Sequence, residues 1–145
     1  METKFKHNKV RLTGKRKAVL MAAMYHAKAL GIDKTAWTIR INFIKGFSKT
    51  EGNMANCGID GKLTIGIAID CDLPGYVLQN TIAHEMVHAK QWIMGELSTK
   101  GGFMRWNGKK VSSKLAYHET PWEREAMASE VLMAHGFIHF LESMK

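Results

Sequence analysis

The chain has 145 residues and a net charge of +8, and 46% of its residues are hydrophobic while 23% are charged. This balance excludes intrinsic disorder and predicts a soluble globular protein with one domain over residues 1–145. The longest uninterrupted apolar run, AVLMAAMY at 18–25, is far shorter than the roughly 20 residues of a membrane-spanning helix, so no membrane partner is expected.

The positive charge is concentrated at the N-terminus, where residues 1–17 contain seven basic side chains and one acidic side chain, Glu2. We interpret about residues 1–13 as a basic arm, which either contacts nucleic acid weakly through phosphates or only keeps the chain soluble. The second interpretation is favoured, because Phe5 alone offers a ring for stacking on bases. Since the arm lacks the apolar stretch of a signal peptide, the expected location is the cytoplasm.

The next segments predict a helix and then strands. Strong helix-forming residues precede a glycine stop signal, which predicts a first helix over about 14–30. The segment AWTIRINFI alternates β-forming and polar residues, and LTIGIAID repeats this pattern after the turn dipeptide Asp60-Gly61. Two or three antiparallel strands with a hairpin at this turn are therefore expected.

An amphipathic helix is predicted over 74–94, because apolar residues recur there at spacings of three and four. His84 and His88 are one turn apart and therefore share a face of this helix, with Glu85 beside them. Two imidazoles at this spacing can bind one zinc ion, while the glutamate is offset enough to hold a water molecule instead. We therefore predict His84 and His88 as metal ligands and Glu85 as the general base, the alternative being an ordinary solvent-facing helix surface.

A catalytic zinc ion needs three protein ligands and one open position, so a third ligand must come from another segment. The best source is YHETPWEREAMASE at 117–130, where Thr120 and Pro121 are typical of the start of the last helix. The pair Thr120 and Glu123 also matches a capping box, which would give Glu123 a purely structural role.

The projection of the last helix favours a metal ligand over a cap. Glu123 and Glu130 fall within its apolar half, where a carboxylate needs a partner such as a metal ion, whereas Glu125 falls outside it. Glu123 is therefore the first candidate for the third ligand, with Glu125 and His118 as alternatives. Glu130 is a candidate for orienting a ligand histidine. Tyr117 precedes this helix and is either a hydrogen-bond donor to the oxyanion or a packed aromatic residue.

The sequence AHEMVHAKQW, followed about 35 residues later by PWEREA, resembles the gluzincin metallopeptidases. It is most similar to the small phage and prophage-type proteins related to the SprT-like and ImmA/IrrE-like groups. The resemblance covers about 76–130 and implies the same three ligands and the same base. It also implies a zincin fold, in which an antiparallel sheet covers the active-site helix and its edge strand aligns a peptide. Met127 departs from the pattern, since relatives usually have Asp or Asn after the E-x-E-A motif.

The expected fold is therefore an α+β, zincin-like single domain with a small antiparallel sheet on the active-site helix and a C-terminal helix that supplies the third ligand. The expected function is hydrolysis of peptide bonds in a protein or peptide substrate, with Zn²⁺ as the cofactor and manganese or cobalt as alternatives. One rival is a nucleic-acid-associated module that uses the basic arm. Another is a phage-encoded virion or host-interaction protein whose zinc site is structural. The sequence does not predict an oligomeric state.

Overall fold

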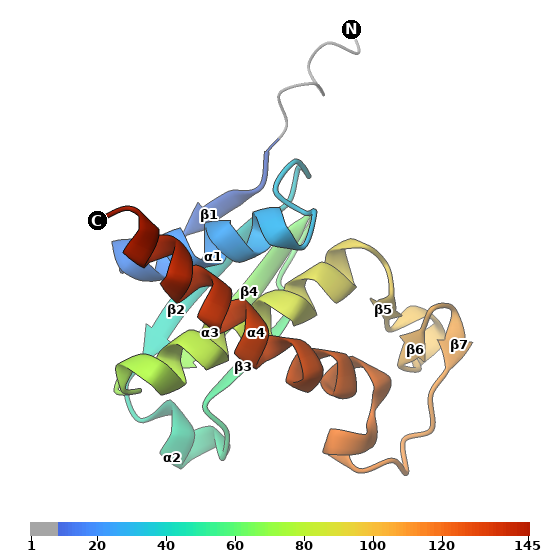
Figure 1. Ribbon diagram of the computed structural model, residues 1–145. Helices are drawn as coiled ribbons and strands as arrows, with labels where there is room; N and C mark the ends of the chain where they lie inside the picture. The colour runs from blue at the N-terminus through green and yellow to red at the C-terminus, as the bar shows by residue number, and fades with distance from the viewer. Residues whose placement is uncertain (1–8) are drawn as a thin grey trace, which may run out of the picture.

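Four strands form the central sheet in the order β1-β2-β4-β3 (Figure 1). The structure, a computed structural model, describes residues 9–145. Strand β2 pairs in parallel with both β1 and β4, whereas β3 pairs with β4 in the antiparallel direction. The bounds of these strands are Arg11–Thr13 (β1), Thr38–Ile44 (β2), Ala55–Ile59 (β3) and Thr64–Asp70 (β4).

The α+β class is confirmed, but the expectation of an antiparallel sheet is wrong, because the sheet is mixed. After β2 the chain passes through the short helix α2, Phe47–Glu51, and returns along the outer edge as β3. The hairpin expected at Asp60-Gly61 then brings β4 back between β2 and β3. Strand β4 therefore runs parallel to β2, and β3 remains as the antiparallel edge strand.

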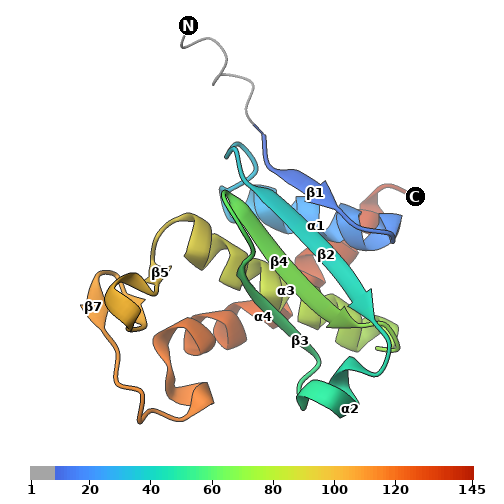
Figure 2. The same ribbon diagram turned by 180° about the vertical axis from the view of Figure 1, so that it is seen from behind.

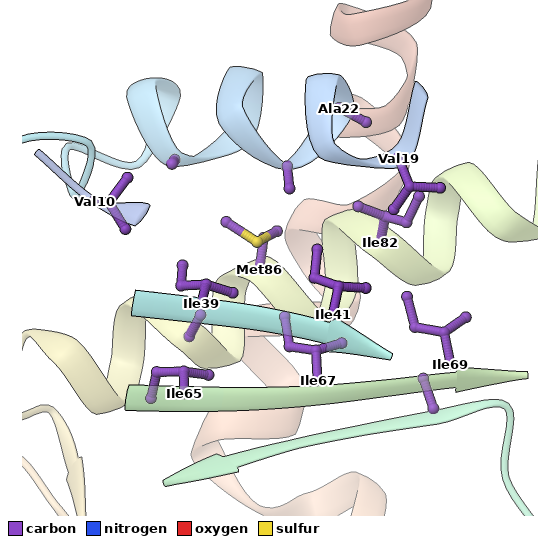
Figure 3. Close-up of a cluster of buried hydrophobic side chains, with 14 of the residues drawn as sticks. Val10, Val19, Ala22, Ile39, Ile41, Ile65, Ile67, Ile69, Ile82 and Met86 are labelled. Carbon is purple, nitrogen blue, oxygen red and sulfur yellow. The ribbon is translucent and has the colours of Figure 1, made fainter. Parts of the chain in front are cut away.

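Three helices cover one face of this sheet, as Figure 2 shows from the sheet side. They are α1 (Lys17–Ala29), α3 (Gly75–Ile93) and α4 (Pro121–Ser143). Alternate residues of β2 and β4 point toward them, and each isoleucine of this set is at most 1% exposed (Figure 3). Burying each of these side chains contributes about 2 kcal/mol. The set consists of Ile39, Ile41, Ile65, Ile67 and Ile69.

A second sheet lies between α3 and α4 in the chain, with strands Leu97–Ser98 (β5), Arg105–Trp106 (β6) and Lys109–Lys110 (β7). A tight turn joins β6 and β7: Asn107 and Gly108 both have positive φ, 50° and 83°, as a tight two-residue hairpin requires. Residues 9–145 also contain two single-turn 3-10 helices, η2 at Lys100–Gly102 and η3 at Tyr117–Glu119.

The C-terminal end of the expected basic arm, about residues 1–13, belongs to the folded domain. Residues 1–8 lie outside the described residues, but Arg11–Thr13 form the edge strand β1. Val10, which precedes this strand, is buried in the core. Within residues 9–145, no helix combines the length and apolar character needed to cross a membrane.

His26 of α1 is an unusual core residue. Its side chain is 0% exposed, and within residues 9–145 neither ring nitrogen has a hydrogen-bond partner. The ring packs instead against Tyr25 and Phe137, with ring-centroid distances of 5.5 Å and 6.0 Å. Burial therefore lowers the pKa of His26 from 6.5 to about 4.

This burial predicts an acid-labile core. The unfolded chain binds a proton at His26 below about pH 6.5, whereas the folded chain does so only near pH 4, so folding loses stability as the pH falls through this window. Replacing His26 with Leu removes this pH-dependent loss of stability. The difference in unfolding free energy between His26→Leu and wild type should increase by about 3 kcal/mol from pH 7 to pH 4. Urea unfolding of both proteins at each pH measures it, and a difference that is independent of pH would contradict the prediction.

Candidate metal centre

The two histidines of the predicted motif lie side by side on α3. Their ring centroids are 4.8 Å apart, and the two Nε2 atoms are separated by 3.2 Å. This follows from helix geometry, because residues four apart project from the same face. Helix α3 is packed between the sheet and α4, so His88 is buried and His84 is only partly exposed.

Glu123 in the first turn of α4 completes the group. Glu123 is 3% exposed. Its Oε1 lies 2.9 Å from His84 Nε2, and its Oε2 lies 2.8 Å from His88 Nε2. The capping-box alternative for Glu123 is wrong, because Thr120 at the N-cap makes no side-chain capping bond. The Thr120 hydroxyl donates a hydrogen bond to the carbonyl oxygen of Tyr117 instead.

The three side chains fit a metal ion. One donor atom from each of His84, His88 and Glu123 lies within 4.8 Å of the others. Ligand atoms of a tetrahedral zinc ion are roughly 3.4 Å apart for bonds of about 2.0–2.1 Å. The observed separations of 2.8–3.2 Å need only a small outward movement to reach that spacing. The group is thus compatible with a metal ion, and its geometry does not distinguish zinc from other divalent metals.

Electrostatic coupling within the group is strong. Burial disfavours a charged Glu123, but hydrogen bonds from the two histidines outweigh it and lower the pKa of Glu123 to about 2. Burial also opposes charging of His84 and His88, yet their bonds to Glu123 and the neighbouring carboxylates raise both pKa values. Glu85 is 5% exposed, and burial raises its pKa to about 7 against the opposing effect of the two histidines.

A buried glutamine, which the sequence analysis did not identify, orients His88. Gln91 is 0% exposed, and its Oε1 accepts a hydrogen bond from His88 Nδ1 at 2.8 Å. Its Nε2 donates to the carbonyl oxygen of Trp122 at 3.0 Å and to Glu125 at 2.9 Å. In the neutral imidazole, this arrangement places the proton of His88 on Nδ1 and leaves Nε2 free to bind a metal.

The structure also places the other candidate residues, the two alternative third ligands and the carboxylate expected to orient a histidine. Glu125, an alternative third ligand, points away from the histidines and accepts hydrogen bonds from Gln91 and Lys90. His118, the other alternative, is exposed in η3 and does not belong to the group. Glu130 lies 3.4 Å from His84 Nδ1, where a carboxylate can orient that ring as predicted.

Removing the Gln91 hydrogen bond should weaken metal binding without removing a ligand. Gln91→Leu keeps the size of the side chain but leaves His88 Nδ1 without its acceptor and removes one hydrogen-bond donor from Glu125 and one from the Trp122 carbonyl. We expect zinc affinity to fall about 10- to 100-fold, the usual effect of losing a group that orients a ligand. Competition with a chromophoric chelator measures it. Glu125→Gln, which retains an acceptor for Gln91, is the matched control and should change affinity less than about three-fold.

A cleft lies on both sides of Glu85, between β3 and the two helices that carry the ligands. It consists of two adjoining cavities of about 240 and 210 Å³, and both are lined by Asn53, Ala55, Glu85 and Tyr117. The first also includes His84 and the second His88. The predicted base therefore faces open space next to the candidate metal ligands.

Tyr117 lies at this cleft with its side chain largely exposed, since the residue is 66% accessible. Partial burial and the negative charge and hydrogen bonding of Glu123 raise the pKa of its hydroxyl. The hydroxyl consequently remains protonated at neutral pH and can donate a hydrogen bond. A packed aromatic residue would be buried. The exposure of Tyr117 at the cleft therefore favours its interpretation as a hydrogen-bond donor.

Comparison of the chain with protein-family models, curated proteins and solved structures finds no match.

Proposed function

We propose that this protein is a metal-dependent peptidase of the zincin type, with zinc bound by His84, His88 and Glu123. The observation that carries the proposal is the convergence of these three side chains beside a buried Glu85 that faces a cleft. Buried carboxylates are rare without a partner, and two adjacent ones next to two histidines are a common arrangement for metal-assisted hydrolysis. The resemblance of the motifs to gluzincins supports the same function.

The residues divide the chemistry of hydrolysis between them. A zinc ion on the three ligands would polarise the scissile carbonyl and lower the pKa of a water molecule to about 7. Glu85 would accept a proton from the attacking water as the water oxygen bonds to the carbonyl carbon. Glu85 then donates the proton to the amide nitrogen as the carbon–nitrogen bond breaks, so the products are a carboxylic acid and an amine. Tyr117 donates a hydrogen bond to the carbonyl oxygen as negative charge develops there.

The edge strand β3 would hold the substrate in an extended conformation. Among residues 9–145, β3 pairs on one side only, with β4, so its other edge is available to a further strand. Ala55 and Asn56 of β3 line the cleft beside Glu85. An extended peptide that adds to this edge by main-chain hydrogen bonds would pass directly over the candidate ligands.

Hydrolysis of a peptide library by the zinc-loaded protein tests the proposed function. Peptide cleavage should appear with zinc, disappear on chelation and return when zinc is added back. Mass spectrometry of the products identifies the cleaved bonds. A zinc-loaded protein that binds its metal tightly and cleaves nothing in a diverse library would contradict a peptidase function.

A further inference from the structure

The cleft adjoins a further pocket that is lined by Thr120, Trp122 and residues between 102 and 115. We call residues 97–115 the hairpin segment. This pocket has a volume of about 380 Å³. It shares Met104 and Trp122 with the part of the cleft that contains His88 and Glu123. Its apolar walls are completed by Phe103, Val111 and Leu115. A peptide that passes over the ligands would therefore place a side chain in this pocket, which we call the hairpin pocket.

The hairpin segment is strongly basic. Residues 97–115 contain five basic side chains and no acidic one. Arg105 is used internally, because it donates hydrogen bonds to the carbonyl oxygens of Lys100 and Gly108. The four lysines of the segment are exposed, namely Lys100, Lys109, Lys110 and Lys114.

Lys110 connects this charge to the apolar pocket. It lines the pocket, and its Nζ lies 3.7 Å from the centroid of the Phe103 ring. The cation–π contact holds a positive charge at the wall of an apolar site. Among residues 9–145, no ion pair joins any of the four exposed lysines to an acidic side chain. The charge of these lysines is therefore not neutralised by an internal ion pair.

We propose that the hairpin segment selects substrates in which an apolar side chain is flanked by acidic residues. The apolar side chain would occupy the hairpin pocket, and the acidic residues would face Lys110, which lines this pocket. This inference rests on the proposed peptidase function and adds the substrate class. A pocket with a positive charge at its wall favours a ligand of opposite charge and disfavours one of the same charge.

Binding can be measured separately from hydrolysis by using zinc-loaded Glu85→Gln protein, which should hold a peptide without cleaving it. The probes are fluorescein-labelled peptides with a central leucine flanked on both sides by Asp and Glu, by Gln, or by Lys. Fluorescence anisotropy gives the Kd of each. We expect the acidic peptide to bind at least about ten-fold more tightly than the lysine peptide, with an affinity that falls as salt increases.

Charge reversal of Lys110 tests the location of this selectivity. Lys110→Glu should weaken binding of the acidic peptide about ten-fold and strengthen binding of the lysine peptide, an inversion that misfolding would not produce. The matched control is Lys34→Glu, which changes the net charge by the same amount. Lys34 lies in the α1–β2 loop, away from the hairpin segment. The control should change both affinities by less than about two-fold.

The outcomes separate this inference from the proposed function. Equal affinity for the acidic, glutamine and lysine peptides would overturn the inference even if wild type cleaves peptides. An oligodeoxythymidylate that binds more tightly than the acidic peptide, and loses binding in Lys110→Glu, would also overturn it in favour of single-stranded nucleic acid. Selective binding of the acidic peptide without cleavage by zinc-loaded wild type would support the inference and contradict the peptidase function.

Discussion

Replacing Glu85 with Gln should lower kcat for peptide hydrolysis by about 100- to 10 000-fold, the usual contribution of a general base. Glutamine retains the size of the side chain but cannot accept a proton from water. Because Glu85 is buried at the cleft and is not one of the three candidate ligands, the variant should keep its zinc. Steady-state kinetics on a cleaved library peptide, with zinc content measured in the same samples, checks both expectations.

The matched control for this variant is Glu130→Gln, the carboxylate beside His84 Nδ1. It lines the same cavity as Glu85 but is placed to orient a ligand, so its kcat should change far less. Full activity in zinc-loaded Glu85→Gln would contradict the assignment of Glu85 as the base. Loss of zinc from Glu85→Gln would contradict its placement outside the ligand set.

Replacing Glu123 with Ala should weaken zinc binding by about a thousand-fold or more, because it removes one of three protein ligands. It also leaves His84 Nε2 and His88 Nε2 without the carboxylate that both contact. Zinc titration against a chromophoric chelator measures this change. Glu125→Ala is the informative comparison, because Glu125 lies two residues further along α4 and contacts Gln91 and Lys90 instead. A larger loss of affinity in Glu125→Ala than in Glu123→Ala would contradict the assignment.

The placement of His84, Glu85 and His88 was predictable because it depends on the geometry of a single helix. Glu123 required one more step, namely that a carboxylate on the apolar side of an amphipathic helix needs a buried partner. The structure provides that partner across the interface between α3 and α4. The alternative of a solvent-facing helix surface for this motif is therefore wrong, because Glu85 and His88 are buried.

Strand directions were not predictable in the same way, because alternation of apolar and polar residues is the same in parallel and antiparallel strands. The direction of β4 relative to β2 depends on where β3 returns along the sheet, which no local pattern specifies. Strand β1 falls within the segment interpreted as a basic arm, because Arg11–Thr13 is only three residues long and follows Lys4, Lys6 and Lys9. Its pairing with β2 is a tertiary contact.

The role of Gln91 had only a weak sequence signal, a polar residue one turn after His88 on the buried side of α3. Its importance depends on the Trp122 carbonyl and on Glu125, which α4 brings to it from more than 30 positions along the chain. The position of Lys110 at the hairpin pocket likewise depends on how the hairpin segment packs beside the cleft. Outer groups of a site are therefore harder to predict than its ligands, because they depend on packing between elements.

The most direct test of a metal centre is the metal content of the purified protein, measured by mass spectrometry after loosely bound ions are removed. Wild type, His84→Ala and Glu123→Ala are compared under the same conditions. The account predicts one zinc ion per wild-type chain and a strong reduction in both variants. No tightly bound metal in wild type, even after zinc is resupplied, would contradict it.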